Sequence, residues 1–391
     1  MNEEMTRGEL LRRGAGGAAL LSVPGLLAAC GGGGGGGTAG ASSTEELKKV
    51  LNFANWPYYI DTPQTLKSAG IDKPTTLKQF EAKTGIKVNY FEDVNSNPEY
   101  FAKVQGRLSR GQGIGRDIFV STDNDRPAGE YVSNKWVQKL DKSLIPNVSN
   151  LIAAQQHPPF DPDREYSLPW LSGMDGIAWN EELTDPVTTV DKLFTDPKLK
   201  GKVTVWNSMG DTLGLVMLEN GDDPAKVTDA SFDRSIAKVQ KAVDSGQIRR
   251  FTGNDYAQPL ANGDLAACFA WSGDVAQLIA DNPKLHWSVP EHGWIIWTDN
   301  MVIPLGGSVP TASTYMTVVY DPQIAAQIAV CTSYISSVDG VKPYAVKLDP
   351  DSAKNPLIFP DAGTLSQLHQ IDPTMFSNPD YNKKWLAVQG K

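Results

Sequence analysis

The chain has 391 residues, of which 40% are hydrophobic, and it carries a formal net charge of −9 at pH 7. That length and apolar content suffice for one large domain or two smaller ones. The acidic balance, with no stripe of Lys and Arg to bind phosphates, argues against a nucleic-acid partner.

The first 29 residues have the parts of a bacterial export signal. Arg7, Arg12 and Arg13 precede an apolar stretch at 15–29, which ends in the sequence Leu-Ala-Ala-Cys at Cys30. This pattern predicts a signal peptide that is cut before Cys30, whose thiol is then acylated. The alternative is a transmembrane anchor, which needs roughly 20 apolar residues, and this glycine-containing run is shorter. The Arg12-Arg13 pair points toward twin-arginine export, although the rest of that motif is poor.

A glycine-rich segment follows the predicted acylation site. Residues 31–37 are all glycine, and small residues continue to Ser43. Such a sequence behaves as a flexible tether, so we assign 30–45 to a tether between lipid and body. One acyl chain binds a membrane weakly, so more than one is expected. The protein is therefore expected on the outer face of the cytoplasmic membrane.

The first part of the body alternates between strand and helix patterns. We predict strands at 49–54, 86–90 and 117–121, with helices at 76–85 and 98–109 between them. Pro57 stops the first strand, which leaves the aromatic residues at 56–59 on a loop. Strand, helix, strand, helix, strand is the order of a parallel α/β sheet.

The alternation resumes later in the chain. We predict strands at 203–206, 265–271, 287–290, 294–297 and 300–304, and helices at 212–218, 232–244, 274–281 and 321–334. No internal repeat is visible, so the sequence indicates two α/β lobes rather than a repeat array. Cys268 and Cys331 lie in apolar contexts, which favours buried free thiols over a disulfide between them.

Few features point to catalysis. The four histidines, His157, His286, His292 and His369, show no metal-ligand spacing. No nucleophile elbow, Walker loop or dinucleotide fingerprint is present, and the glycine-rich stretch at 111–115 precedes a strand instead of following one. We therefore expect no catalytic residues, no metal and no cofactor.

Tryptophans fall at the ends of predicted strands. Trp56, Trp206, Trp271 and Trp297 each close or follow such a strand, and carboxylates come soon after the last three of them. Ligands of open α/β sheets bind outside the carboxyl ends of the strands. Aromatic faces with carboxylates beside them suit a ligand with cationic ends and an apolar middle. The alternative is that each tryptophan is a core residue at the end of its strand.

With these features in place, the chain resembles the polyamine-binding receptors of bacterial ABC importers, the spermidine/putrescine-binding type. The resemblance runs from Leu51 to Trp385. Its landmarks are NWPYY at 55–59, FEAKTGIKV at 80–88, VQKLD at 137–141, PFDP at 159–162, YSLPW at 166–170, AWSG at 270–273, GWIIWTD at 293–299 and FPDA at 359–362.

The resemblance implies a type II periplasmic-binding-protein fold, in which two α/β lobes close over a ligand cleft. It implies that each lobe is discontinuous in sequence. We place lobe 1 at 46–174 plus 300–344 and lobe 2 at 175–299 plus 345–391. The crossings between the lobes then fall near 174–176 and 299–300.

The resemblance also implies a ligand site. Trp56 and Tyr59 match first-lobe aromatic residues, and Trp271 and Trp297 match second-lobe aromatic residues that enclose a methylene chain. Asp299 matches a carboxylate that holds an ammonium group, and Asp211 falls where a glutamate usually serves another amine.

Two positions depart from the family pattern. Ser208 stands where an aspartate is common, although we keep it among the expected ligand-binding residues. The loop after Val120 lacks an expected aromatic residue, and its Asp123, Asn124 or Asp125 offers polar groups and negative charge instead. A late polar contact is assigned to Gln370.

The resemblance thus implies a monomeric substrate-binding lipoprotein of an ABC importer that takes putrescine, spermidine or a related amine to a membrane permease. One rival is the same fold with another solute, such as an amino-acid-derived or opine-like compound, which would be favoured if an arginine, Arg116 or Arg126, lay in the cleft. A second is a secreted carbohydrate-active enzyme that uses Asp211 and Asp299. A third is a surface protein with a purely structural role.

Overall fold

One mixed β-sheet runs through residues 46–390, the part of the chain that the computed structural model describes. The strand order is β2-β1-β3-β9-β4-β7-β5-β6, and β8, β10 and β11 pair with β4 or β9 beside this path. The predicted signal peptide, Cys30 and the tether lie outside the described residues, and so does the side chain of Arg126. None of the described helices combines the length and hydrophobicity that a bilayer crossing needs.

The elements that precede the sheet's longest strand are β1 (Val50–Asn55), α1 (Pro63–Ser68), α2 (Thr76–Thr84), β2 (Lys87–Glu92), α3 (Asn97–Leu108), β3 (Ile118–Thr122), α4 (Arg126–Ser133), η1 (Lys142–Leu144), η2 (Pro146–Asn150) and η3 (Ala153–Gln155). From that strand to the next long one come β4 (Ser167–Asn180), α5 (Val190–Thr195), η4 (Pro197–Leu199), β5 (Val203–Trp206), α6 (Met209–Glu219), α7 (Asp229–Asp244), β6 (Ile248–Thr252), η5 (Asn254–Tyr256), α8 (Ala257–Ala261), β7 (Ala267–Trp271), α9 (Ser272–Asp281), β8 (Leu285–Ser288) and β9 (Trp294–Val302). The rest are α10 (Val309–Val319), α11 (Pro322–Thr332), β10 (Ile335–Ser336), α12 (Lys342–Leu348), η6 (Ser352–Lys354), α13 (Ala362–Leu365), β11 (Leu368–His369), α14 (Thr374–Ser377) and α15 (Pro379–Val388).

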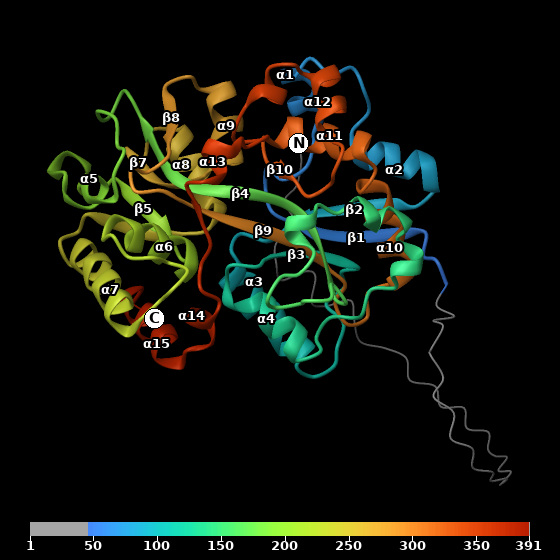
Figure 1. Ribbon diagram of the computed structural model, residues 1–391, viewed down its shortest axis with the longest axis horizontal. Coiled ribbons are helices and arrows are strands. Elements are labelled where there is room, and N and C mark those ends of the chain that lie inside the picture. Colours follow the sequence, from blue (N-terminus) through green and yellow to red (C-terminus); the bar gives the residue numbers. More distant parts are fainter. Residues whose placement is uncertain (1–45, 391) are drawn as a thin grey trace, which may run out of the picture. The chain divides into compact units, whose positions relative to one another are not determined.

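The first half of the sheet is parallel where β1 lies between β2 and β3. Leu51 and Phe53 of β1 are fully buried because helices cover both faces of this half, α3 and α4 on one side and α2, α10 and α11 on the other (Figure 1). α2 is capped by Thr75 at its start and by Gly85 at its end, and the φ of +69° at Gly85 favours glycine. The turn at Gly85 directs the chain into β2.

Two long strands, β4 and β9, join the halves of the sheet (Figure 1). β4 pairs with β9 as far as Met174 and with β7 from Asp175 onward. β9 in turn lies between β4 and β3, antiparallel to both. Within residues 46–390, the strands of the second half, β5, β6 and β7, join the rest of the sheet through the pairing of β7 with β4.

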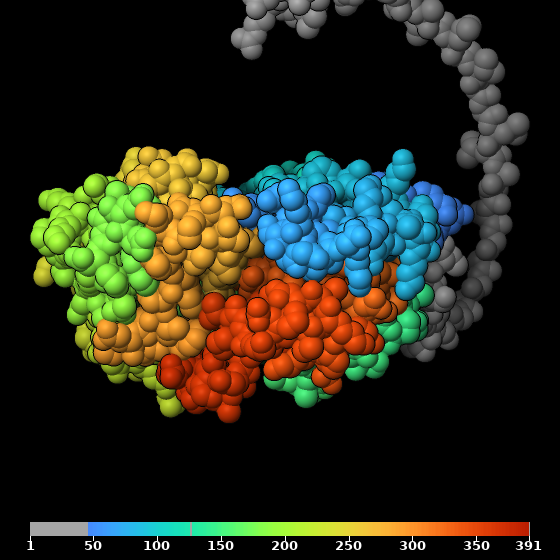
Figure 2. Space-filling model, turned by 90° about the horizontal axis from the view of Figure 1, so that it is seen from above, coloured from blue at the N-terminus to red at the C-terminus, as the bar shows by residue number. Residues whose placement is uncertain are grey.

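Segments from separate parts of the sequence build each half of the sheet and its covering helices. In Figure 2 the blue and cyan early segments lie at one end of the body and the green and yellow middle segments at the other, while orange segments occur at both ends. The predicted lobe boundary at 344 falls inside α12 (Lys342–Leu348), a helix that packs on α11.

Most predicted elements are confirmed within one to three residues, including β1, α2, β2, α3, β3, β5, α7, α9 and α11. The prediction of separate strands at 294–297 and 300–304 is wrong, because 294–302 is one continuous strand, β9. Trp297 consequently lies in the middle of a strand and not at its end. The structure also adds β4, β6 and α10, for which we predicted no element. Cys268 and Cys331 are free and buried, as predicted.

Candidate functional site

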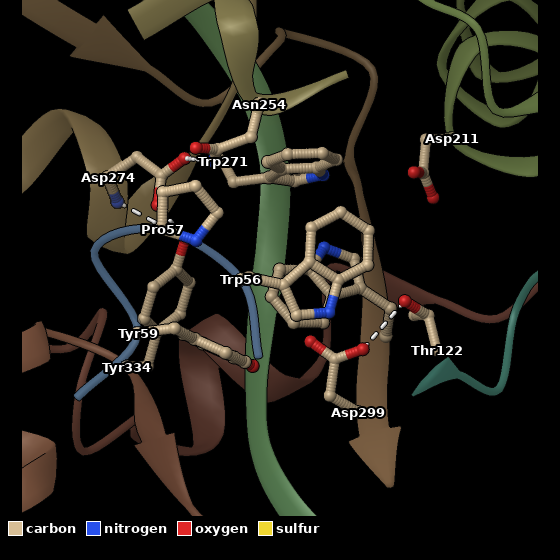
Figure 3. A pocket seen from close by; sticks show the side chains of 11 residues that line it. Trp56, Pro57, Tyr59, Thr122, Asp211, Asn254, Trp271, Asp274, Asp299 and Tyr334 are labelled. Atoms are coloured by element: carbon tan, nitrogen blue, oxygen red, sulfur yellow. Dashed lines mark hydrogen bonds between the residues drawn. The ribbon is translucent and has the colours of Figure 1, made fainter. Parts of the chain in front are cut away.

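A pocket lies beside the crossing strands and holds about 310 Å³ of space that protein atoms do not occupy, part of it open to solvent. All of its lining side chains except Pro57 are buried. They are Trp56, Pro57, Tyr59, Thr122, Asp211, Asn254, Trp271, Asp274, Trp297, Asp299 and Tyr334, most of them labelled in Figure 3. We call this pocket the cleft.

Trp271 forms the centre of the cleft's aromatic wall. It ends β7, and its ring stacks on that of Trp206 with the ring centroids 5.3 Å apart and 15° between the planes. Trp56, which follows β1, meets Trp271 edge to face with 5.6 Å between the centroids. Trp206 is fully buried behind Trp271 and does not line the cleft. The stack therefore fixes the orientation of the Trp271 face.

A second aromatic group closes the opposite part of the wall. The ring of Tyr334 meets Tyr59 edge to face at 4.8 Å and lies 5.6 Å from Trp297. Close packing requires glycine here, because a Cβ at Gly173 would approach the Trp297 ring to 2.4 Å. A Cβ at Gly273 would likewise come within 2.4 Å of the Tyr334 ring. These two glycines let rigid rings lie directly against the backbone.

Asp299 places a carboxylate beneath these rings. It lies on β9 directly opposite Thr122 of β3, and the Thr122 hydroxyl donates a hydrogen bond of 2.6 Å to Asp299 Oδ1. The pKa of Asp299 is raised to about 7, chiefly by burial and also by the charges of the nearby Asp123 and Asp274 carboxylates. The hydrogen bond from Thr122 opposes this rise by stabilising the ionised form.

Asp211 lies in the first turn of α6. Ser208 is the N-cap of that helix, and its hydroxyl accepts a long hydrogen bond of 3.5 Å from the Asp211 backbone N–H. Asn124 Nδ2 donates to Asp211 Oδ1 at 2.7 Å and so fixes the carboxylate. Burial, followed by the charges of Asp125 and Asp299, raises the pKa of Asp211 to about 7.

Asp274 supplies a third carboxylate. It receives hydrogen bonds from Asn254 Nδ2 at 2.6 Å, from the Tyr256 hydroxyl at 2.8 Å and from the Tyr334 hydroxyl at 2.7 Å. Burial raises its pKa to about 6, while these three donors lower it. Figure 3 shows Asp274 and Asp211 on opposite sides of the Trp56 and Trp271 rings, with Asp299 below them.

The sequence-predicted residues divide into two groups. Trp56, Tyr59, Asp211, Trp271, Trp297 and Asp299 all line the cleft. The other four, Ser208, Asp123, Asn124 and Gln370, do not line it. Asn124 and Ser208 form hydrogen bonds with Asp211. Asp123 Oδ1 accepts a hydrogen bond of 2.9 Å from the Thr298 backbone N–H. Gln370 is exposed and follows β11.

Five lining residues were not assigned to the site from the sequence: Pro57, Thr122, Asn254, Asp274 and Tyr334. Asp274 had a signal, since it follows Trp271 by three residues. Thr122 had a weaker signal, because it lies at the end of β3, in the segment after Val120 that departs from the family pattern. Asn254 and Tyr334 reach the cleft through packing between distant segments, which no local pattern reveals.

The described lining contains three carboxylates and neither Lys nor Arg. Arg116 donates to Asp93 Oδ2 at 2.8 Å and lies over the Phe91 ring, away from the cleft. Among residues 46–390 no cluster of His, Cys, Asp and Glu has the arrangement of a metal site. The cleft is thus an acidic, aromatic pocket that suits an organic cation.

The raised pKa values predict an unusual pH dependence of stability. Asp211, Asp274 and Asp299 have folded-state pKa values of about 7, 6 and 7, against about 3.9 in an unfolded chain. Their stabilising contribution is complete below the unfolded value and is lost as the pH rises through the folded values. The ligand-free protein should therefore lose about 1 kcal/mol or more of unfolding free energy between pH 5 and pH 7.5.

Urea unfolding at the two pH values measures this loss. Asp299→Asn removes one of the three groups, so its loss should be smaller than that of the wild type. A wild-type protein that gains stability over this interval would contradict the assignment of the raised pKa values.

Comparison with known proteins gives three findings. The model of the family described as bacterial extracellular solute-binding protein matches residues 75–360. The spermidine/putrescine-binding periplasmic protein of Escherichia coli K12 is 25% identical over 320 residues, which cover 81% of this chain and 84% of the relative. A spermidine/putrescine ABC transporter structure from Listeria monocytogenes is 26% identical, with a TM-score of 0.70, and the match covers 88% of this chain and 99% of that one.

A further structure, that of AgtB from A. tumefaciens R10 in complex with agropinic acid, has a TM-score of 0.70 at 15% identity, covering 88% of this chain and 99% of that one. At this identity the similarity concerns the fold alone. Together with the Listeria structure it confirms the predicted fold class, a type II periplasmic-binding-protein fold with two α/β lobes.

Proposed function

We propose a function for this chain from the premise that it belongs to the family of bacterial extracellular solute-binding proteins. It binds a diamine or polyamine such as putrescine or spermidine and delivers this ligand to the permease of an ABC importer. The observation that carries the proposal is the trio of Asp211, Asp274 and Asp299 around stacked tryptophans. The Escherichia coli and Listeria relatives, described as spermidine/putrescine proteins, support it.

Each part of the ligand has a role in the proposal. Ammonium groups form charge-assisted hydrogen bonds with carboxylates, and Asp274 and Asp211 lie on opposite sides of the rings. The methylene chain between the ammonium groups packs on the faces of Trp56 and Trp271, which also attract cations. Asp299 lies below the rings, where it reaches an ammonium or an internal amine. An uncharged sugar would leave these buried carboxylates without a counter-charge.

Entry of the ligand requires the cleft to open, because almost all lining side chains are buried. We propose that the two lobes, 46–174 plus 300–344 and 175–299 plus 345–391, move about the crossing strands β4 and β9. A ligand that touches both lobes binds the closed form more tightly and shifts the population toward it. The permease then recognises the closed form.

As a member of an extracellular family, the chain is exported. We propose that a lipid on Cys30 anchors it to the outer face of the cytoplasmic membrane, that the 30–45 segment is the tether, and that the protein acts as a monomer without catalytic activity. Detergent phase partitioning tests the anchor: the wild type should enter the detergent phase and Cys30→Ser should stay in water. Light scattering tests the monomer.

A ligand panel tests the proposed function. The exported body is titrated by calorimetry and melted with putrescine, spermidine, γ-aminobutyrate, agropinic acid and glucose. Putrescine or spermidine should raise the melting temperature, because a ligand at 100 times its Kd stabilises by about 2.7 kcal/mol. Stabilisation by agropinic acid alone would contradict the amine assignment, and turnover of a glycoside would contradict the non-catalytic one.

A further inference from the structure

Asp175 lies in β4 at the point where this strand changes its partner from β9 to β7. It is fully buried and stands directly opposite Trp271. Opposed residues of paired strands share one face of the sheet, so the Asp175 side chain lies on the face that carries the cleft wall. Gly173 shares that face, and the Trp297 ring that lies against it donates from Nε1 to Asp175 Oδ1 at 2.9 Å.

The second oxygen of Asp175, Oδ2, is buried and has no hydrogen-bond partner within residues 46–390. The Asp175 carboxyl group is close enough to that of Asp211 for the two to interact, and Asp211 lines the cleft whereas Asp175 does not. Two carboxylates that interact at a buried site are not both ionised unless a cation lies between them. The charges that act on Asp211 from other elements, those of Asp125 and Asp299, are also negative. The pair therefore requires a proton or a cation.

We propose that Asp175 acts in ligand binding through Asp211: the two carboxyl groups hold one proton in the empty cleft and give it up to solvent when a ligand ammonium takes its place. This inference rests on the proposed function, because it assumes an amine ligand. The exchange balances: the amine enters as its ammonium ion, one H⁺ leaves the carboxyl pair, and no covalent bond of the ligand changes.

The electrostatics of the pair agree with this role. Burial, followed by the charge of Asp211, raises the pKa of Asp175 well above its ordinary value. A proton thus remains on the pair near neutral pH in the absence of ligand. Since binding releases that proton, amine affinity should increase as the pH rises through neutrality.

Calorimetric titration of putrescine at pH 7 in phosphate and in Tris measures the released protons, because the two buffers differ in their enthalpy of protonation. The wild type should release about one proton or more for each ligand bound. In Asp175→Asn the amide oxygen still accepts from Trp297 Nε1, and Asp211 and Asp299, with pKa values of about 7, still exchange part of a proton at pH 7. Proton release should therefore fall clearly below that of the wild type, and affinity should drop about tenfold or more.

Asp61→Asn is the matched control. Asp61 is another buried carboxylate, hydrogen-bonded to Thr76 and Gln327, and it does not line the cleft. This variant should keep both the affinity and the proton release of the wild type.

Three outcomes overturn the inference. Binding of putrescine to the wild type without proton release does so even if no variant folds. Weaker binding by Asp175→Asn with normal proton release would make Asp175 only a positioning residue for Trp297. If neither putrescine nor spermidine binds the wild type, the proposed function fails and the assignment of Asp175 falls with it.

Discussion

Asp299→Asn is expected to weaken putrescine binding by about 2 kcal/mol or more, which is a rise in Kd of about thirtyfold. The substitution keeps an oxygen for the Thr122 hydroxyl and removes the charge that faces the ligand. A buried ammonium that loses its counter-charge is left partly unpaired, and this penalty accounts for most of the loss. Calorimetric titration at pH 8, above the Asp299 pKa of about 7, measures it.

Stability separates this explanation from a folding defect. Because burial disfavours the ionised form of Asp299, the ligand-free variant should be at least as stable as the wild type at pH 7.5. Unchanged affinity would remove Asp299 from the ligand site. A parallel loss of affinity and stability would show that the residue supports the fold instead.

Trp271→Ala is expected to lower the free energy of unfolding by about 3–5 kcal/mol, the usual range for removing a buried tryptophan. Trp271 stacks on Trp206 and meets Trp56 and Trp297 edge to face, so its loss opens a void at the centre of the wall. The ligand also loses its contact with an aromatic face. In a desolvated site this loss weakens binding by about 2 kcal/mol. Urea unfolding and calorimetric titration measure the two effects.

Trp294→Ala provides the control for Trp271. Trp294 is equally buried and lies on β9, where its Nε1 donates to Gln367 Oε1 at 3.2 Å, but it does not line the cleft. Its loss should lower stability while the affinity for putrescine stays within about twofold of the wild type. Equal losses of affinity in the two variants would mean that binding responds to general destabilisation.

Most of the fold could be predicted because its elements follow simple patterns. Segments such as β1 and α2 combine apolar periodicity with clear stop signals at Pro57 and Gly85. β4 escaped prediction because its centre, Ser172 to Gly176, contains polar residues and glycines that interrupt any apolar run. In β9 the polar stretch at 298–300 likewise divides one strand into two apparent ones.

The site was predictable where its residues lie close to strand ends. Trp56 and Trp271 were found in this way, and Asp299 came from the family resemblance. Tyr334 was not found, because it follows α11 and reaches Asp274 across 60 positions of sequence. The proposed role of Asp175 was not predicted either. It depends on interactions with Trp297 and Asp211, which come from two other elements.

The place of β9 between β3 and β4 also dictates the order in which the molecule is able to assemble. β3 ends at Thr122, yet its partner strand begins at Trp294, and the helices that cover this half extend to Leu348. The other half needs α15, which packs on α7 near the end of the chain. A polypeptide made from its N-terminus therefore completes neither half until most of it has been synthesised, and such long-range pairing is slow. During that interval we expect each half to lack part of the packing that stabilises it.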